Sequence, residues 1–293
     1  MALNNLCERL DVVTPRKPLK EIERSLQTTY RKEIWAKFIR AIKTYNLIEE
    51  NDCIAVAISG GKDSIILAKL MMQLQKYSDI PFTVKYISMN PGFKMDNLKQ
   101  MEENCRYLEI PVVIKESDVF KVAERLASDN PCYMCARMRR GFLYKLAQDE
   151  GCNKLALGHH FDDVIETTLL NIFYGSQYKT MVPKIKAENF ENMELIRPLV
   201  LIKEADIIRF TKSSGIQTMN CGCTVAAKRF GSKRAVVKKL IEDLKKDNPN
   251  VDYSIFKSAT NINLNQVYGY QLDEKIVEFN DIYEGRRKDV HDV

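Results

Sequence analysis

The residues best suited to chemistry form a short motif, Ser-Gly-Gly-Lys-Asp-Ser, at residues 59–64. The motif directly follows an apolar run at residues 53–58, which predicts a buried strand, and it precedes a helical pattern at residues 64–77. Two adjacent glycines let backbone N–H groups approach an anion, and the N-terminus of the following helix adds partial positive charge. With two hydroxyls and one ammonium group beside them, these residues predict a phosphate-binding loop. A plain turn with a helix cap is the alternative, which the strand–loop–helix context disfavours.

A pair of cysteines, Cys132 and Cys135, forms a second chemical motif with C-x-x-C spacing. Such a pair can hold a metal ion or one edge of a cluster, or it can cycle as a dithiol. A structural zinc site usually has a second pair of comparable spacing, whereas this chain offers Cys221 and Cys223 in a tighter C-x-C pair. Three cysteine ligands would leave one coordination position open, which suits a cluster that carries a reactant. A chance pair at the start of a helix is the alternative for the first two cysteines.

The remaining cysteines carry no comparable motif. Cys53 begins an apolar strand and Cys152 precedes another, so we expect both to be core thiols, while Cys7 and Cys105 are assigned no role. The N-terminal residues have no apolar segment of signal-peptide length, and the run at residues 53–58 is far too short to cross a bilayer. We therefore expect a cytoplasmic protein without a membrane partner, in a compartment where disulfides are rare.

Two of the three histidines lie in a turn at residues 158–163, Gly-His-His-Phe-Asp-Asp, between a predicted strand and a predicted helix. Imidazole and carboxylate groups in such a turn suggest a metal site or a catalytic site. Carboxylates in the first turn of a helix also stabilise the helix dipole, which is the simpler alternative. We favour a catalytic role for this turn.

A regular alternation of strands and helices separates these motifs, and it predicts an α/β fold with a doubly wound parallel sheet. In such a sheet the ligand binds at the carboxyl ends of the strands, where the phosphate loop would lie. The predicted strands are residues 53–58, 82–89, 112–115 and 154–157, and the predicted helices are residues 64–77, 95–108, 118–127 and 137–150, with another from residue 161.

The flanking segments have a different character. Apolar residues recur at helical spacing between residues 17 and 46, which predicts a helical leader. The alternation breaks at residues 175–195, which we expect to form a mobile excursion. Further helices are expected at residues 203–213 and 233–246, followed by a charged tail from residue 268. We predict three parts, namely a leader at residues 1–50, a nucleotide-binding domain at residues 51–220 and a C-terminal helical region at residues 221–293.

The composition is that of an ordinary globular chain. The 293 residues are 45% apolar and 29% charged, which excludes a disordered protein and a small disulfide-rich module. The net charge of +6 suggests an anionic partner. Basic residues cluster beside both cysteine pairs, where they could bind an RNA backbone and present an unpaired loop base, although a solvated surface is the alternative. The residues expected to bind RNA are Arg137, Arg139, Arg140, Lys228, Arg229, Lys233 and Arg234.

The motif at residues 59–64 resembles the PP-loop of the ATP pyrophosphatases, which adenylate a carbonyl oxygen and release pyrophosphate. The segment C-x-x-C-x-x-M-R-R-G-x-L-Y, together with residues 157–163, 171–175 and 196–199, is similar to the tRNA 2-thiocytidine synthetase branch of that family. The resemblance covers most of residues 30–250 and implies a nucleotide-hydrolase-like α/β fold that uses ATP and Mg²⁺. It assigns the phosphates and the nucleoside to Ser59, Gly60, Gly61, Lys62, Ser64, Met89 and Gly158, and the Mg²⁺ side to Asp63, Asp162 and Asp163.

For the cysteines, the resemblance implies a [4Fe-4S] cluster whose free iron carries the sulfur to be transferred. Cys132 and Cys135 match the first two ligands, and we expect Cys223 as the third ligand, with Cys221 as the alternative. In the implied reaction, Asp63 helps to place the reacting groups while the O2 carbonyl of an anticodon-loop cytidine, position 32, is adenylated and replaced by sulfur. The implied partners are tRNA and a cysteine desulfurase or other sulfide donor, and homodimers are common in this branch.

Two other functions are the alternatives. The first is thiolation of a uridine or a small molecule on the same scaffold. The resembled thiouridine branch usually carries zinc-binding cysteine pairs at its ends, whereas only Cys7 lies at the N-terminus here, which disfavours this alternative. The second is a nucleotide- or iron–sulfur-binding sensor without turnover, which is disfavoured by an intact phosphate motif together with both cysteine groups.

Overall fold

The computed structural model describes residues 15–93, 95–119, 122, 131–219, 233–273 and 275–291, without the side chains of residues 131–136 and 286–291. The chain forms two compact units, Met1–Asp243 and Leu244–Val293. The larger unit contains every predicted site residue.

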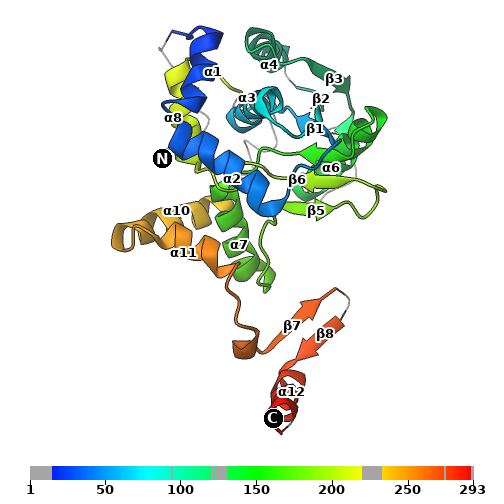
Figure 1. The fold of residues 1–293 in the computed structure, drawn as a ribbon, viewed down its shortest axis with the longest axis vertical. Coiled ribbons are helices and arrows are strands. Elements are labelled where there is room, and N and C mark those ends of the chain that lie inside the picture. The colour runs from blue at the N-terminus through cyan, green and yellow to red at the C-terminus, as the bar shows by residue number, and fades with distance from the viewer. Residues whose placement is uncertain are drawn as a thin grey trace. The chain divides into compact units, whose positions relative to one another are not determined.

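A six-stranded sheet forms the centre of the larger unit, with strand order β3-β2-β1-β4-β6-β5 (Figure 1). The predicted parallel sheet is confirmed for the first five strands in this order, whereas β5 pairs antiparallel to β6 at one edge. The order reverses beside β1, so β1 and β4 adjoin at the switch point where α/β sheets bind ligands. The strands are β1 (Cys53–Ala57), β2 (Thr83–Asn90), β3 (Val112–Glu116), β4 (Lys154–Ala156), β5 (Lys184–Lys186) and β6 (Glu194–Ile196).

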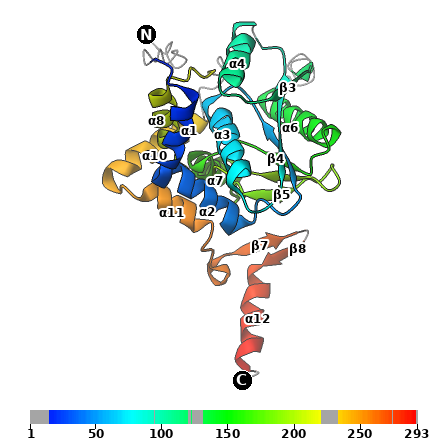
Figure 2. The same cartoon turned by 45° about the horizontal axis from the view of Figure 1, so that its top comes forward.

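Helices cover both faces of this sheet, because successive side chains of each strand point to opposite faces. Ile54 and Val56 of β1 pack in one core with α3 and the leader, whereas Ala55 packs in a second core with α6. Figure 2 shows α3 and α6 on opposite sides of the strands. The helices of this unit after the leader are α3 (Lys62–Tyr77), α4 (Met95–Tyr107), α6 (Pro131–Asp149), α7 (Phe161–Gly175), α8 (Glu204–Ser214) and α10 (Lys233–Asp247), whose last residues belong to the smaller unit.

The predicted boundaries differ from the structure at a few places. The helix predicted at residues 137–150 begins earlier, at Pro131, because proline is well suited to the first helical position. The helix predicted at residues 118–127 lies largely outside the described residues. The expectation of an excursion at residues 175–195 is wrong in part, since this segment contains β5 and the start of β6. These strands are only three residues long, which is too short for a periodic pattern to reveal.

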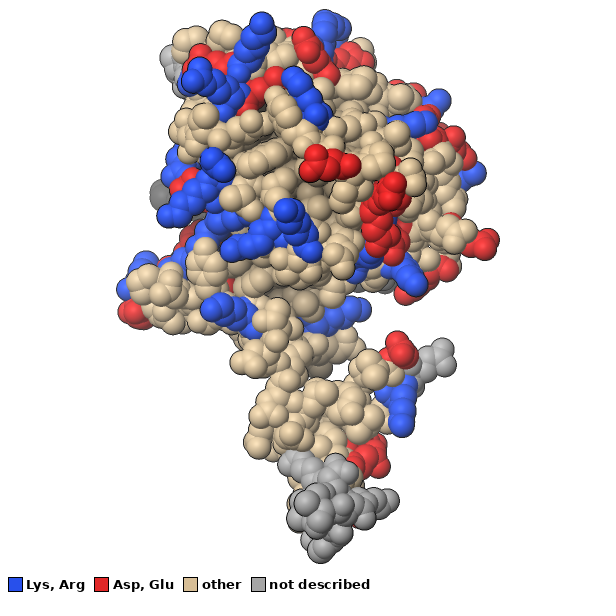
Figure 3. All heavy atoms as spheres, in the orientation of Figure 1, with Lys and Arg blue, Asp and Glu red and all other residues tan. Residues whose placement is uncertain are grey.

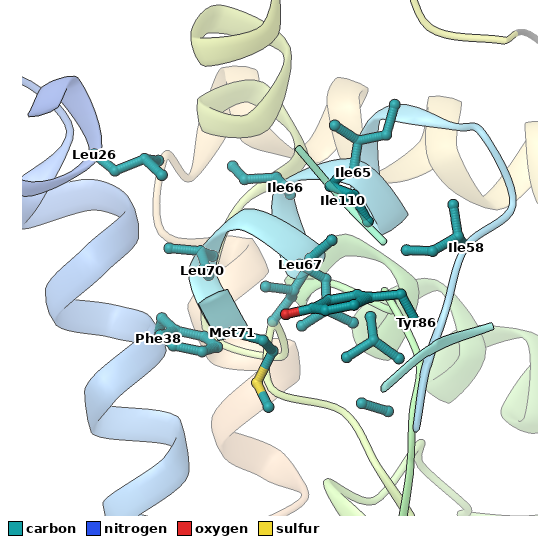
Figure 4. Close-up of a cluster of buried hydrophobic side chains, with 14 of the residues drawn as sticks. Leu26, Phe38, Ile58, Ile65, Ile66, Leu67, Leu70, Met71, Tyr86 and Ile110 are labelled. Atoms are coloured by element: carbon teal, nitrogen blue, oxygen red, sulfur yellow. The ribbon is translucent and has the colours of Figure 1, made fainter. Parts of the chain in front are cut away.

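The leader folds as predicted, into α1 (Leu19–Gln27), a π-helical segment (Arg31–Trp35) and α2 (Ala36–Tyr45). Its periodic apolar residues enter the main core, and Figure 4 shows Leu26 and Phe38 directed at Leu70 and Met71 of α3. The fully buried ammonium of Lys69 on α3 fastens the two parts further, since it donates 2.7 Å to Glu23 of α1 and 2.9 Å to the carbonyl of Leu108. The leader is therefore part of the core of the larger unit.

The two cysteines expected in the core lie together at the amino-terminal end of β1 and β4. Cys152 is buried, Cys53 is half-buried, and their sulfur atoms are 2.9 Å apart. Cys105 is also buried, and the loss of solvent raises the pKa of its thiol to about 11. The interpretation of Cys152 as a core thiol is confirmed, and Cys53 packs against the same core.

The smaller unit contains the end of α10, α11 (Val251–Ser258), a 3₁₀ turn (Leu264–Gln266), an antiparallel hairpin of β7 (Gly269–Leu272) and β8 (Lys275–Glu278), and α12 (Phe279–His291). A salt bridge of 3.0 Å from Lys245 to the buried Asp252 joins the first two elements. In the described parts of both units, no helix is long and apolar enough to span a membrane.

We expect Phe38→Ala to destabilise the larger unit by about 3–5 kcal/mol, because it removes a fully buried ring from the contact between α2 and α3. Urea unfolding followed by circular dichroism measures the free energy of unfolding. Tyr77→Ala is the matched control, because Tyr77 is 60% exposed at the end of α3 and its loss should cost under about 0.5 kcal/mol. Equal losses in the two variants would show that the leader is not a structural part of this unit.

Candidate active site

The phosphate motif forms a tight loop between β1 and α3, at the carboxyl edge of the sheet. The Ser64 hydroxyl donates 2.9 Å to the carbonyl of Gly61 and accepts from the backbone N–H of Ser59 at 3.1 Å. Gly60 has a positive φ of 78°, which favours glycine. The first N–H groups of α3 have no partner four residues earlier within the helix, so they are available to an anion at this end. The loop therefore has the form that the sequence predicts for a phosphate site.

Gly158 lets a second turn approach this loop closely. A Cβ atom at this position would come within 3.0 Å of the backbone carbon and oxygen of Asp63. Only a residue without a side chain fits such a contact between two backbones. The turn that carries the two histidines is thus held directly against the N-terminus of α3, and a contact of Gly158 with the nucleotide remains a prediction.

A chain of charges links three helices beside the loop. The Lys62 ammonium is 3.1 Å from Asp63 and 2.9 Å from Glu204, the first residue of α8, and Glu204 also pairs with Lys238 of α10 at 2.7 Å. Burial alone would raise the pKa of Glu204, but the two ammonium groups hold it at about 2. Burial raises the pKa of Asp63 in spite of the neighbouring Lys62. The two carboxylates raise the pKa of Lys62 in spite of its partial burial, so its ammonium stays charged.

The turn at residues 158–163 caps the N-terminus of α7, as the simpler alternative predicts. His160 and Asp163 form a reciprocal capping box at the start of α7: the Asp163 carboxylate accepts from the His160 N–H at 3.0 Å, and His160 Nδ1 accepts from the Asp163 N–H at 3.4 Å. Asp162 accepts 2.7 Å from the backbone N–H of Glu204. The turn therefore also joins the N-termini of α7 and α8, next to the phosphate loop.

Three buried polar atoms near this turn have no hydrogen-bond partner among the described residues, namely Asp63 Oδ1, His159 Nδ1 and Arg197 Nε. Burial lowers the pKa of Arg197 to about 10, and Arg140 on α6 adds to the effect. Another Arg197 nitrogen donates to the carbonyl of Val182. A buried polar atom without a partner costs free energy, so these atoms are suited to contact a bound group.

The other predicted nucleotide residue, Met89, is buried near the carboxyl end of β2, beside β1. It therefore lies at the correct edge of the sheet, and its contact with adenine remains a prediction. Asp63, Asp162 and Asp163 are the predicted Mg²⁺ side, but the described residues contain no group of three or more His, Cys, Asp and Glu side chains arranged to hold a metal ion. The Mg²⁺ site also remains a prediction.

Cys132 and Cys135 lie at the start of α6, and their side chains are outside the described part of the structure. The 19-residue helix is about 28 Å long, and its last residue adjoins the amino-terminal end of β4. Its first turn therefore lies toward the carboxyl edge of the sheet, the edge that carries the phosphate loop. Cys221, Cys223, Lys228 and Arg229 are outside the described residues.

The predicted RNA-binding residues that the structure describes lie on two helices, α6 and α10, and differ in exposure and in their partners. Arg137 and Arg140 are exposed on α6, and Arg139 is half-buried. Arg234 pairs with Glu166 at 3.1 Å and with Asp163 at 3.5 Å, so it fastens α10 to α7. Lys233 lies 4.8 Å above the ring of Tyr174.

Glu204 and Arg197 also line the site, although no sequence motif predicts either of them. Glu204 could have been suspected because it begins a predicted helix, and Arg197 lies in one of the segments that carry the family resemblance. A basic face over the leader was missed as well. Figure 3 shows Lys and Arg side chains over α1 and α2, among which Arg31, Lys32, Arg40 and Lys43 are exposed.

The sequence of this chain matches a known protein family. The family model described as the PP-loop domain matches residues 22–223. A tRNA-cytidine(32) 2-sulfurtransferase of Geotalea uraniireducens is 39% identical over 242 residues, which are 81% of this chain and 92% of the relative. A protein of the same name from Bdellovibrio bacteriovorus is 34% identical over 264 residues, 89% of this chain and 96% of the relative. The chain belongs to the PP-loop family and, within it, groups with the tRNA-cytidine(32) 2-sulfurtransferases.

A solved structure confirms the fold. The U34-tRNA thiolase NcsA from Methanococcus maripaludis, determined with its [4Fe-4S] cluster, has a TM-score of 0.61 to this chain at 24% identity. The similarity covers 77% of this chain and 76% of that protein. The predicted α/β architecture of the PP-loop proteins is therefore confirmed.

We expect the His159→Gln variant to lose less folding stability than the wild type when the pH falls into the mildly acidic range. Burial lowers the pKa of His159 to about 4, below its ordinary value near 6.5. Between these values the unfolded chain binds a proton that the folded chain does not, so folding stability falls by up to about 3 kcal/mol as the pH falls through this window. The glutamine cannot titrate, and urea unfolding of both proteins at pH 7 and pH 4 measures the difference. An equal loss in the wild type and the variant would contradict burial of a neutral imidazole.

Proposed function

We propose that this chain is an ATP-dependent tRNA sulfurtransferase that converts cytidine 32 of the anticodon loop to 2-thiocytidine. The observation that carries the proposal is the phosphate loop, closed by the Gly158 turn, in a chain that aligns with almost the whole length of relatives bearing that name. Adenylation suits this site, because the half-buried ammonium of Lys62, whose pKa is raised by Asp63 and Glu204, and the N-terminus of α3 can stabilise the charge of a departing pyrophosphate.

The chemistry proceeds in two stages. Ser59, Gly60, Gly61, Lys62 and Ser64 hold the ATP phosphates while the O2 carbonyl of the cytosine attacks the α-phosphorus and pyrophosphate leaves. The cytosine then carries AMP on O2, so an oxygen that leaves poorly becomes part of a good leaving group. Asp63 and the aspartates of the α7 turn, Asp162 and Asp163, would hold Mg²⁺ for the phosphates, and Met89 would contact the adenine. Attack of sulfur at C2 then expels AMP.

Cys132, Cys135 and Cys223 would hold a [4Fe-4S] cluster, with Cys221 as the alternative third ligand. When bound, the cluster would supply iron chemistry for the delivery of sulfur. The sulfur comes from cysteine through a desulfurase or from another sulfide donor. Arg137, Arg139 and Arg140, one turn after the cysteines, contact tRNA phosphates, as do Lys228, Arg229, Lys233 and Arg234. The start of α6 lies toward the same edge of the sheet as the ATP loop, which supports a common reaction site.

The direct test is anaerobic thiolation of a tRNA transcript that has a cytidine at position 32, with ATP, sulfide and the reconstituted protein. We expect one 2-thiocytidine per tRNA, detected by nucleoside mass spectrometry, together with pyrophosphate release. A transcript with uridine at position 32 is the matched control and should remain unmodified. Thiolation of a uridine elsewhere would replace the proposed substrate, and absence of pyrophosphate release with either transcript would indicate a sensor.

We expect Cys132→Ala to lose iron and thiolation while it retains ATP binding, because the cysteine would hold the cluster and the ATP loop lies on another element. Iron analysis, the thiolation assay and ATP calorimetry measure the three properties. Cys105→Ala is the control, since Cys105 is buried in the core and belongs to neither cysteine motif. Retained thiolation in the Cys132 variant would overturn the assignment of the cluster ligands.

A further inference from the structure

The C-terminal end of α7 exposes a group of aromatic side chains that the reaction chemistry does not use. Phe173 is 52% exposed, Tyr174 is 47% exposed, and Tyr178 in the following loop is 46% exposed. Singly exposed apolar residues are ordinary, but three exposed aromatic residues within six positions of the chain can together make a binding surface. We propose that Phe173, Tyr174 and Tyr178 form a platform on which unpaired bases of the tRNA stack.

The platform is held in place by hydrogen bonds to α7. The Asn171 amide donates 2.7 Å to the carbonyl of Lys179, and the Asn171 carbonyl accepts 3.1 Å from the N–H of Gln177. The hydroxyls of Thr168 and Thr180 are 2.8 Å apart. These bonds fix the loop that carries Tyr178 against the helix that carries the other two rings. A surface that is already ordered loses little entropy when it binds a partner.

The charges around the rings favour a nucleic acid. Lys233 on α10 holds its ammonium 4.8 Å above the ring of Tyr174, and Lys179 is exposed in the loop. Residues 167–186 contain three lysines and no Asp or Glu. Aromatic rings beside cations fit a single-stranded segment, whose bases stack while its phosphates contact the cations. A second copy of this chain would instead bring a second set of the same lysines to this surface, and like charges oppose such a contact.

The position of the platform fits the proposed reaction, on which this inference rests. α7 begins at the turn that closes the phosphate loop, and Tyr174 lies about 16 Å further along the helix than Asp163. An RNA loop can span that distance and keep one base at the reaction site while its neighbours stack on the rings. The salt bridges from Arg234 to Glu166 and Asp163 fasten α10, and with it Lys233, to the same helix. The platform would therefore orient the anticodon loop relative to the ATP site.

The test compares the Phe173→Ala/Tyr174→Ala double variant with Tyr77→Ala, which removes an equally exposed ring from the far end of α3. Loss of base stacking costs about 1–3 kcal/mol per base, so we expect the KM for tRNA to rise at least fivefold, with kcat at saturating tRNA and the Kd for ATP unchanged. Tyr174→Phe keeps the ring and should keep the wild-type KM. An unchanged KM in the double variant, with wild-type thiolation intact, would overturn the platform and leave the proposed function standing.

Fluorescence detects base stacking directly, because a residue with only a structural role would show no quenching when tRNA is added. Phe173→Trp adds an indole to the platform, and stacked bases should quench its emission when tRNA is added. The single native tryptophan, Trp35, packs against the core and supplies the baseline in the wild type. Quenching in the variant without thiolation by the wild type would support RNA binding while refuting the proposed reaction. If the double variant changed the oligomeric state in sedimentation and kept the wild-type KM for tRNA, the patch would be an interface between copies.

Discussion

The close contact between the turn at Gly158 and the backbone of Asp63 is the constraint on which the site depends. β1 and β4 are neighbours at the switch point of the sheet, but two loops that leave neighbouring strands normally keep side chains between them. The absence of a side chain at residue 158 removes that separation. As a result, the N-termini of α3 and α7 converge on one space, where both contribute partial positive charge. An ATP phosphate chain needs such an environment.

Ion pairs hold two of the side chains around this space, Lys62 and Glu204, in their charged forms. Glu204 stays ionised because Lys62 and Lys238 flank it, and Lys62 stays protonated because of Glu204 and Asp63. Asp162 accepts from the first N–H of α8, which ties that helix to the same turn. His159 is held neutral by burial, so it adds no positive charge beside Arg197. The site therefore presents a fixed electrostatic field to its substrate, which reduces reorganisation during the reaction.

The leader supports this arrangement by packing against α3. Its apolar residues cover α3, the helix whose N-terminus forms the phosphate loop, and Lys69 adds a buried polar link to Glu23. The exposed side of the leader is basic, as is the region around α10. The positive charge of the chain is thus unevenly distributed. Lys and Arg side chains gather on these surfaces, where they are suited to contact the phosphate backbone of an RNA.

The sequence by itself determined the order of the main elements, the phosphate loop and the buried face of the leader. Each of these is written in local periodicity or in a contiguous motif, since residues 59–64 must be neighbours along the chain to form one loop. Only the tertiary structure decided that β5 runs antiparallel, that Glu204 faces Lys62, and that Arg234 pairs with Glu166 rather than standing free. Those features join residues far apart in the sequence, and a pattern along the chain carries no information about which distant charges burial will bring together. The same reason explains the aromatic surface of α7: the sequence shows the rings, but only packing decides which of them remain exposed.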